Sequence, residues 1–162
     1  MPMSFTVTGM DELMKAMDQL PDKAAKVAAE ALYEGAGVMA DEVGRAVQGI
    51  ATKPFVKAKG GFKRMASPEE KAVLMKARKG IAKFKNNGNE ITTSVGFQNS
   101  GYADLDGKQV PIPMIANAIN SGTSFRQKQP FLRKAFVQGE KKATAAIENG
   151  IRSREDELKI DD

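Results

Sequence analysis

Polar and apolar residues alternate one by one near the start of the chain and then change to a helical spacing. The alternation over 4–8 predicts a short strand, which Gly9 ends. Apolar residues three and four positions apart over 10–20 predict a short helix that stops before Pro21. We therefore expect the chain to open with a strand followed by a helix.

Two longer segments each carry one apolar stripe at helical spacing. The first stripe predicts a helix over 22–47. Its members are Ala28, Leu32, Ala36, Met39, Val43 and Val47. The second predicts a helix over 130–152. Its members are Leu132, Phe136, Gly139, Ala143, Ile147 and Ile151. Gly35, Gly37 and Gly44 lie in the first helix, and small residues let another backbone approach closely. We expect ordinary core packing against a sheet or helix, with a contact between subunits as the alternative.

Lysine, glycine and proline dominate the segment after the first long helix. Residues 51–66 therefore predict an irregular basic loop or arm. Ser67, Pro68 and Glu70 then form the pattern of a capping box, which predicts a helix over 68–79.

Strand patterns and turn residues fill the chain before the last helix. Alternation over 81–85 and 90–97 around an Asn-Gly turn predicts a β-hairpin. Its expected inner side consists of Ile91, Thr93, Val95 and Phe97. Residues 98–110 are predicted to be a polar loop. Residues 111–120 are apolar and fit helix or strand equally, and a turn follows at Gly122.

These elements predict an α+β fold. A small antiparallel sheet packs against the long helix of the N-terminal half and the C-terminal helix, with a basic extended arm or loop beside them. We expect one domain over 1–152, with 51–80 as a basic arm or insertion within it. Residues 153–162 form a charged tail that is expected to fray.

Composition narrows the possible functions. The 162 residues include no cysteine, histidine or tryptophan. Without histidine and cysteine there is no Ser-His or Cys-His nucleophile pair and no thiolate metal site. We expect no catalytic residues, metal or cofactor. Any active site would have to use carboxylates, lysine, tyrosine or a bound metal, and a carboxylate–metal enzyme is the third hypothesis for the function. No apolar run approaches the roughly 20 residues that span a bilayer, so no membrane contact is expected.

The net charge of +5 is unevenly distributed. Residues 51–90 carry eleven basic and three acidic side chains, whereas 1–50 and 135–162 are acidic. This basic segment is the candidate surface for a partner or for DNA. Its candidate residues are Lys53, Lys57, Lys59, Lys63, Arg64, Lys76, Arg78 and Lys79.

Two interpretations of the basic segment stay open. Nine of its eleven basic residues are lysines, which lack the planar fork that reads a base edge, and no DNA-binding motif accompanies them. Sequence-specific recognition is therefore not expected. The segment is either a solvated face or arm that docks on an acidic protein surface, or a site of non-specific contact with nucleic acid.

One acidic motif resembles a calcium loop only partly. Asp104, Asp106 and Gly107 fit its beginning, but Ile115 stands where the closing glutamate is needed. We interpret the motif as a turn.

Two blocks of sequence resemble a known family. The first is Gly9-Met10-Asp11-Glu12-Leu13 before a long alanine-rich helix, and the second is Asn120-Ser121-Gly122-Thr123-Ser124 followed by Gln129-Pro130-Phe131-Leu132-Arg133-Lys134-Ala135-Phe136. Together with Val95-Gly96 at a strand end, they resemble the head–tail joining and tail-completion proteins of long-tailed bacteriophages, the lambdoid "putative tail component" group. The matching positions are Gly9, Leu13, Val95, Gly96, Gly122, Thr123, Pro130, Phe131, Leu132, Ala135 and Phe136.

The resemblance implies a structural virion protein of the phage neck, made in the host cytoplasm. Such proteins assemble as rings, expected to be hexamers, that join the head connector to the tail tube while DNA passes through the lumen. The implied partners are other copies of the chain, head-closure or connector proteins, and tail terminator or tail-tube proteins. We further predict that 53–64 is an extended arm that becomes ordered on assembly. The alternative function is a non-specific DNA-binding accessory protein using the lysine-rich segment 51–85.

Overall fold

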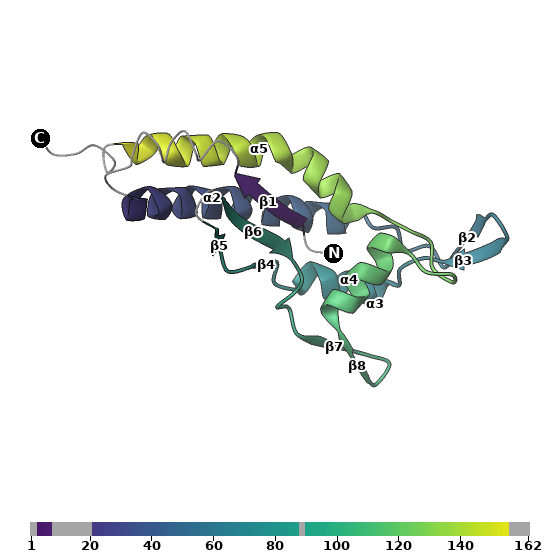
Figure 1. The fold of residues 1–162 in the computed structure, drawn as a ribbon. Coiled ribbons are helices and arrows are strands. Elements are labelled where there is room, and N and C mark those ends of the chain that lie inside the picture. Colours follow the sequence, from purple (N-terminus) through teal and green to yellow (C-terminus); the bar gives the residue numbers. More distant parts are fainter. Residues whose placement is uncertain (1–2, 8–20, 88–89, 156–162) are drawn as a thin grey trace, which may run out of the picture.

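Two long antiparallel helices form the central body of the molecule (Figure 1). The computed structural model describes residues 3–7, 21–87 and 90–155. Helix α2 (Pro21–Gln48) and helix α5 (Phe131–Ser153) lie side by side over most of their lengths. Both predicted long helices are therefore confirmed to within one residue at each end. The predicted helix over 10–20 lies outside the described residues.

Small residues let α2 and α5 approach closely, as the glycines of α2 predicted. A Cβ atom added at Gly35 would lie 2.5 Å from Cγ1 of Ile147. On α5, a Cβ added at Gly139 would lie 2.8 Å from Sδ of Met39. The predicted stripe of α2 is fully buried, from Ala28 to Val47. This stripe therefore forms part of the hydrophobic core of its own chain. Gly37 lies on another side of α2 and faces open space.

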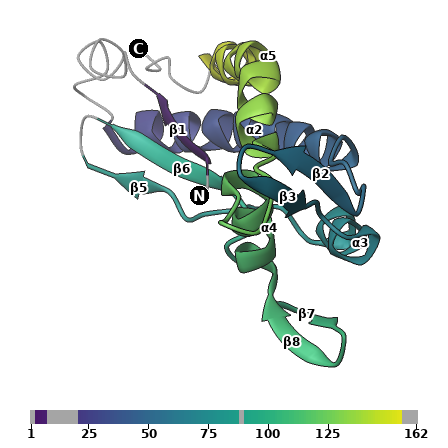
Figure 2. The ribbon, with the colours of Figure 1, turned by 90° about the vertical axis from the view of Figure 1, so that its right-hand side faces the viewer.

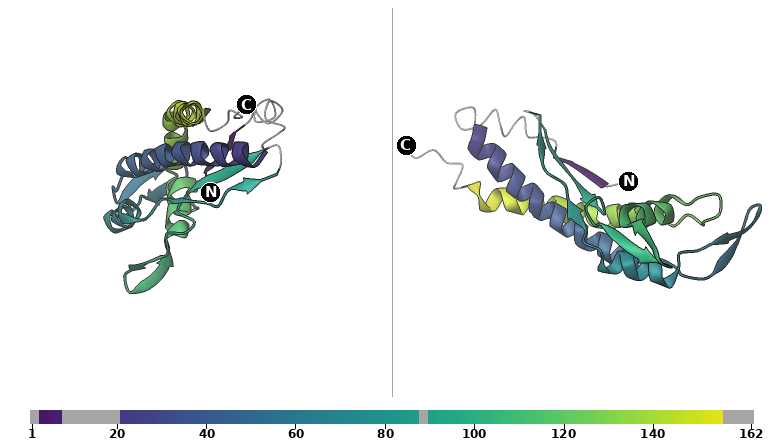
Figure 3. Two further views of the ribbon diagram at one scale, coloured as in Figure 1. Left: turned by 90° about the vertical axis from the view of Figure 1, so that its left-hand side faces the viewer. Right: turned by 90° about the horizontal axis from the view of Figure 1, so that it is seen from below.

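A small antiparallel sheet covers another side of α2, and β6 (Ile91–Gly96) is its central strand (Figure 3). Strand β1 (Met3–Val7) pairs along one edge of β6, in the register Met3–Val95 to Val7–Ile91. Strands β4 (Gly80–Ile81) and β5 (Lys85–Asn86) pair along its other edge. The predicted inner side of β6, including Phe97 just after it, is buried.

The strand predicted over 81–85 is wrong in one respect, because it is interrupted between β4 and β5. Gly80 pairs with Gly96, but Lys85 pairs with Thr92, so the register shifts by one residue between the two strands. One extra residue in 82–84 therefore forms a bulge opposite β6. At the bulge, the Thr93 hydroxyl donates a 2.7 Å hydrogen bond to the Ala82 carbonyl.

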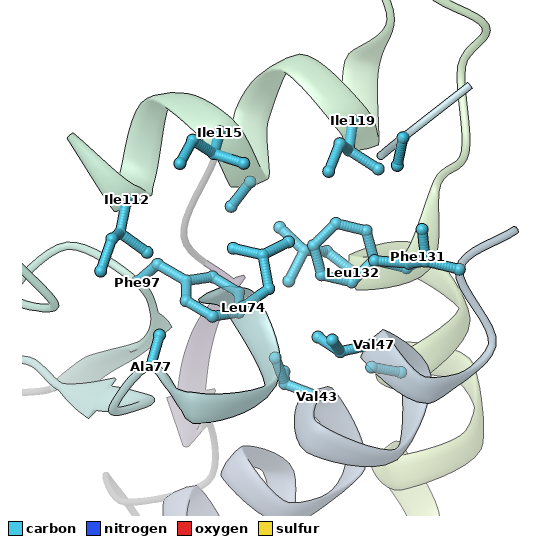
Figure 4. Packing of buried hydrophobic residues seen from close by; sticks show 14 residues of the cluster. Val43, Val47, Leu74, Ala77, Phe97, Ile112, Ile115, Ile119, Phe131 and Leu132 are labelled. Atoms are coloured by element: carbon cyan, nitrogen blue, oxygen red, sulfur yellow. The ribbon is translucent and has the colours of Figure 1, made fainter. Parts of the chain in front are cut away.

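A second core lies where the long helices meet two short ones (Figure 4). Helix α3 (Pro68–Lys76) starts at the predicted capping box, with Ser67 and Glu70 bonded to each other's backbone N–H. It ends before the predicted residue 79 because Ala77 is extended. Segment 111–120, which fitted helix or strand equally, is almost entirely helical and belongs to helix α4 (Ile112–Ser121). Residues from α2, α3, α4 and α5 fill this core, including Val43, Leu74, Ile119 and Leu132.

Two hairpins replace the loops that the sequence predicted (Figure 2). Strands β2 (Phe55–Ala58) and β3 (Gly61–Arg64) form the first, and β7 (Tyr102–Leu105) and β8 (Lys108–Pro111) form the second. The first turn uses positive φ angles at Gly60 and Gly61, and the second uses them at Asp106 and Gly107. These hairpins lack a clear apolar alternation because their strands are largely exposed, which explains why they were predicted as irregular. The basic segment 51–80 is thus a hairpin followed by α3, not an extended arm.

Candidate functional site

One face of the β2–β3 hairpin presents both aromatic rings and cations to solvent. Phe55 pairs with Arg64 and Lys57 pairs with Phe62, so these four side chains lie on the same side of the hairpin. The Phe55 and Phe62 residues are 64% and 76% exposed. Lys59 lies at the exposed turn between the strands. Exposed rings on a projecting hairpin are typical of a surface that contacts a partner.

The loop between α4 and α5 runs beside β3 and carries a third exposed aromatic ring. The Arg64 N–H donates to the Phe125 carbonyl at 2.9 Å, and the Gln127 N–H donates to the Arg64 carbonyl at 2.9 Å. These bonds place the loop alongside β3, in a parallel bridge of Arg64 with Arg126. The Phe125 residue is 82% exposed. The hairpin and the loop therefore lie side by side, and each carries exposed rings.

A buried carboxylate holds this surface to the body. Glu70 of α3 accepts hydrogen bonds from Nη2 of Arg64 at 2.6 Å and from both terminal nitrogens of Arg126 at 2.6 and 2.7 Å. Its other contact is the backbone N–H of Ser67. Burial raises the pKa of Glu70, but the hydrogen bonds from Arg126 and Ser67 and the two positive charges outweigh it, so the pKa lies below its ordinary value. The cluster ties α3, the hairpin and the loop together.

The turn at Gly122 and Thr123 shapes the loop that carries Phe125. Gly122 has a φ of 71°, and a Cβ there would lie 3.0 Å from the backbone of Lys128. The Thr123 hydroxyl oxygen accepts from the N–H groups of Phe125 and Arg126, at 3.3 and 3.0 Å. Gly122 and Thr123, two of the positions that carry the family resemblance, therefore fix the loop. Gly122 does so by its backbone geometry and Thr123 by its side-chain hydrogen bonds.

Residues around the start of α5 connect the loop to the core. The Asn120 side chain accepts from the Leu132 N–H at 3.1 Å, which satisfies one of the free N–H groups of α5. The Gln129 side chain both accepts from and donates to the backbone of Ala51, at 2.8 and 3.0 Å. This clamp joins the segment before α5 to the segment before the hairpin.

The other described positions that carry the family resemblance lie in the interior or at its border. Pro130 is the residue directly before α5. The buried set consists of Val95, Gly96, Phe131, Leu132 and Ala135, and Phe136 is partly buried. The ring of Phe131 contacts that of Phe97 edge to face, with centroids 6.2 Å apart. Gly9 and Leu13 lie outside the described residues.

The structure divides the predicted basic residues into two groups at opposite ends of α3. The first group belongs to the hairpin and the linker before it, and consists of Lys53, Lys57, Lys59, Lys63 and Arg64. The second lies at and after the C-terminal end of α3, and consists of Lys76, Arg78 and Lys79. In the second group, Lys79 packs over the Phe97 ring at 6.0 Å, and burial lowers its pKa. The eight residues therefore do not form one continuous patch.

The sequence reasoning missed Phe125 and Arg126, and it assigned Glu70 only to helix capping. The local capping pattern explains that assignment. Arg126 stands 56 positions after Glu70, and no local spacing connects such residues. Only the isolated ring of Phe125 in a polar stretch could have indicated an exposed contact.

A different charge cluster lies at the opposite end of the molecule. Arg154, directly after α5, donates from Nε to Glu30 at 2.8 Å and from Nη2 to Glu34 at 2.7 Å. The hydrogen bond to Glu34 is the main cause that raises the pKa of Arg154. This cluster fastens the end of α5 to the N-terminal half of α2.

The turn at Asp104 has the role expected from its sequence. An oxygen of Asp104 accepts from the Gly107 N–H at 2.9 Å, which closes the turn of the β7–β8 hairpin. Within the described residues, no group of three acidic or other ligating side chains is placed to hold a metal.

Comparisons with known proteins assign no family. No family model, curated protein or solved structure matches the chain. In the part of the chain that the structure describes, no helix is long and apolar enough to cross a membrane.

Proposed function

We propose that this chain is a structural virion protein of the phage head–tail interface. It forms a neck or tail-completion ring that joins the head connector to the tail tube, with DNA passing through the lumen, and it has no catalytic activity. One observation carries the proposal. The family-type turn at Gly122 and Thr123 holds the exposed Phe125 beside the basic, aromatic β2–β3 hairpin.

The division between a rigid body and projecting hairpins supports this role. The close contact of α2 and α5 forms a body with little freedom to rearrange. The hairpins extend from that body (Figure 1), and Phe62 and Tyr102 on them are exposed. A ring subunit needs such surfaces on two sides to meet two neighbours. The partners are further copies of the chain, head-closure or connector proteins, and tail terminator or tail-tube proteins.

The proposal is tested by the assembly state of the purified chain. Native mass spectrometry and negative-stain electron microscopy are expected to show closed rings, with six copies as the expected number. The ring should bind purified connector or tail-tube protein from the same phage. A chain that stays monomeric at all concentrations, with and without these partners, contradicts the proposal.

A second candidate is a non-specific DNA-binding accessory protein that uses residues 51–85. The observation that favours it is the alternation of Phe55, Lys57 and Phe62 on one face, because exposed rings between cations suit nucleic acid. Binding to random duplex DNA should then weaken steeply with salt. Salt-dependent binding by monomers favours this candidate, whereas rings that do not retain DNA favour the neck protein.

A further inference from the structure

The β2–β3 hairpin and its linker carry positive charge that the described part of the chain leaves unpaired. Residues 53–64, here called the basic hairpin, contain five basic and no acidic side chains. Arg64 is bound to Glu70, but no ion pair within the described residues involves Lys53, Lys57 or Lys59, and all three are exposed. The cations lie beside the exposed rings of the same surface. A matching partner therefore offers carboxylates together with apolar side chains.

The sequence after Arg154 has this composition. Residues 155–162, here called the acidic segment, contain five acidic residues and one lysine, together with Leu158 and Ile160. The segment begins where Arg154 is bound to Glu30 and Glu34. The starting point is fixed at the end of the molecule away from the hairpin (Figure 1).

The acidic segment cannot reach the basic hairpin of its own chain. At a rise of 1.5 Å per residue, the 23 residues of α5 span about 34 Å. Eight residues of fully extended chain span at most about 29 Å. Gln129, before the start of α5, is bonded to Ala51, before the hairpin, so the hairpin lies beyond the far end of α5. Contact between the two is possible only between copies.

We infer that the basic hairpin of one copy binds the acidic segment 155–162 of a second copy. The inference rests on the proposed function and names the contact between neighbouring subunits. Lys53, Lys57 and Lys59 face the carboxylates, and the exposed rings cover Leu158 and Ile160. Because the two surfaces differ and lie at opposite ends, the contact is head to tail, and repeating it produces a ring when the rotation closes.

The test uses charge reversal in the full chain. One variant reverses the hairpin (K53E/K57E/K59E), a second reverses the acidic segment (D156K/E157K/D161K), and a third combines both. The matched control K23E/R133E/K141E makes the same change of charge at exposed residues outside the basic segment 51–90. Sedimentation velocity at several concentrations measures assembly, and circular dichroism verifies that each variant has the melting temperature of the parent.

Each single reversal is expected to raise the concentration needed for assembly by roughly tenfold or more, because like charges then meet in the contact. The combined variant should return to within a few-fold of the parent, and the control should assemble as the parent does. Rings that persist in both single reversals, or a combined variant that stays dissociated while folded, overturn the inference and leave the proposed function standing. A parent chain that is monomeric and binds random DNA through the hairpin overturns both.

A second pair of variants tests the aromatic part of the contact without changing charge. Phe55→Ser and Phe62→Ser remove rings that are mostly exposed, so the melting temperature of the dissociated chain should not fall. Assembly should weaken by roughly tenfold, which is typical for the loss of an interface ring. Unchanged assembly in both variants overturns the assigned role of the rings.

Discussion

Two alanine substitutions in α2 provide a direct test of how closely it packs against α5. Gly35 and Gly37 are two positions apart in the same helix. A Cβ at Gly35 would lie 2.5 Å from Cγ1 of Ile147 and 3.1 Å from the backbone oxygen of Ala143, whereas a Cβ at Gly37 meets no atom within 4 Å. The same change of residue therefore has a cost in packing at one position and none at the other.

The magnitudes follow from two opposing effects. Each substitution gains about 1 kcal/mol of unfolding free energy, because alanine favours a helix interior over glycine by that amount. Only Gly35→Ala also meets the overpacking cost of about 1–3 kcal/mol. We expect Gly37→Ala to be more stable than the parent by about 1 kcal/mol and more stable than Gly35→Ala by about 1–3 kcal/mol. For a chain of this size, this difference is a separation of roughly 2–12 °C in melting temperature.

Thermal unfolding of both variants at one low protein concentration measures the separation. The Ile147→Ala background removes the atoms that a Cβ at Gly35 would meet first, so the cost of Gly35→Ala should largely disappear there. Equal stabilisation by Gly35→Ala and Gly37→Ala in the parent would refute the close approach of the two helices.

Three further predictions concern the surface around the hairpin. Glu70→Gln leaves two arginines without their carboxylate and should lose about 3 kcal/mol of unfolding free energy at neutral pH. Arg64→Ala should lose less than about 1 kcal/mol, because the Arg64 side chain is half exposed. Urea unfolding measures both losses. Folding lowers the pKa of Glu70, so the stability advantage of the parent over Glu70→Gln is complete above the ordinary glutamate pKa of about 4.3. This advantage is lost as the pH falls through the lowered pKa of the folded state. A difference in unfolding free energy that stays constant down to about pH 2 contradicts the prediction. Gly122→Ala should lower the unfolding free energy by about 1–3 kcal/mol, and by more than Gly101→Ala does. Both glycines have a positive φ, but only a Cβ at Gly122 also meets a neighbouring backbone. Equal melting temperatures of the two variants would mean that this backbone contact does not affect stability.

Elements with a buried side were predictable from the sequence. The stripes of α2 and α5 and the alternation of β6 record burial on one side, and burial produces periodicity. The capping box before α3 is a local interaction, so four neighbouring residues were enough to find it. The α+β fold with two long helices followed from these elements.

Elements without a buried side could not be predicted in the same way. The β2–β3 hairpin is exposed along much of both strands, so its sequence lacks the alternation that identifies a strand. The bulge at 82–84 depends on a register shift that no local pattern records.

The candidate surface was predictable only in its charge. The lysines of the hairpin could be identified from composition alone. The loop with Phe125 lies beside the hairpin because Arg64 pairs with Arg126, 62 positions later in the chain. No local sequence pattern predicts a pairing over such a distance.

The contact of α2 with α5 also has a consequence for the order of folding. The two helices are separated by the whole region from Gly49 to Pro130, so a long loop must close before the side of α2 that faces α5 is covered. During synthesis, the side of α2 that faces α5 stays uncovered until α5 leaves the ribosome, and chaperones have time to bind it. The basic hairpin leaves the ribosome long before the acidic segment that we assign to the contact with the next copy. The contact is therefore expected to form only with a copy whose residues 155–162 have already been made.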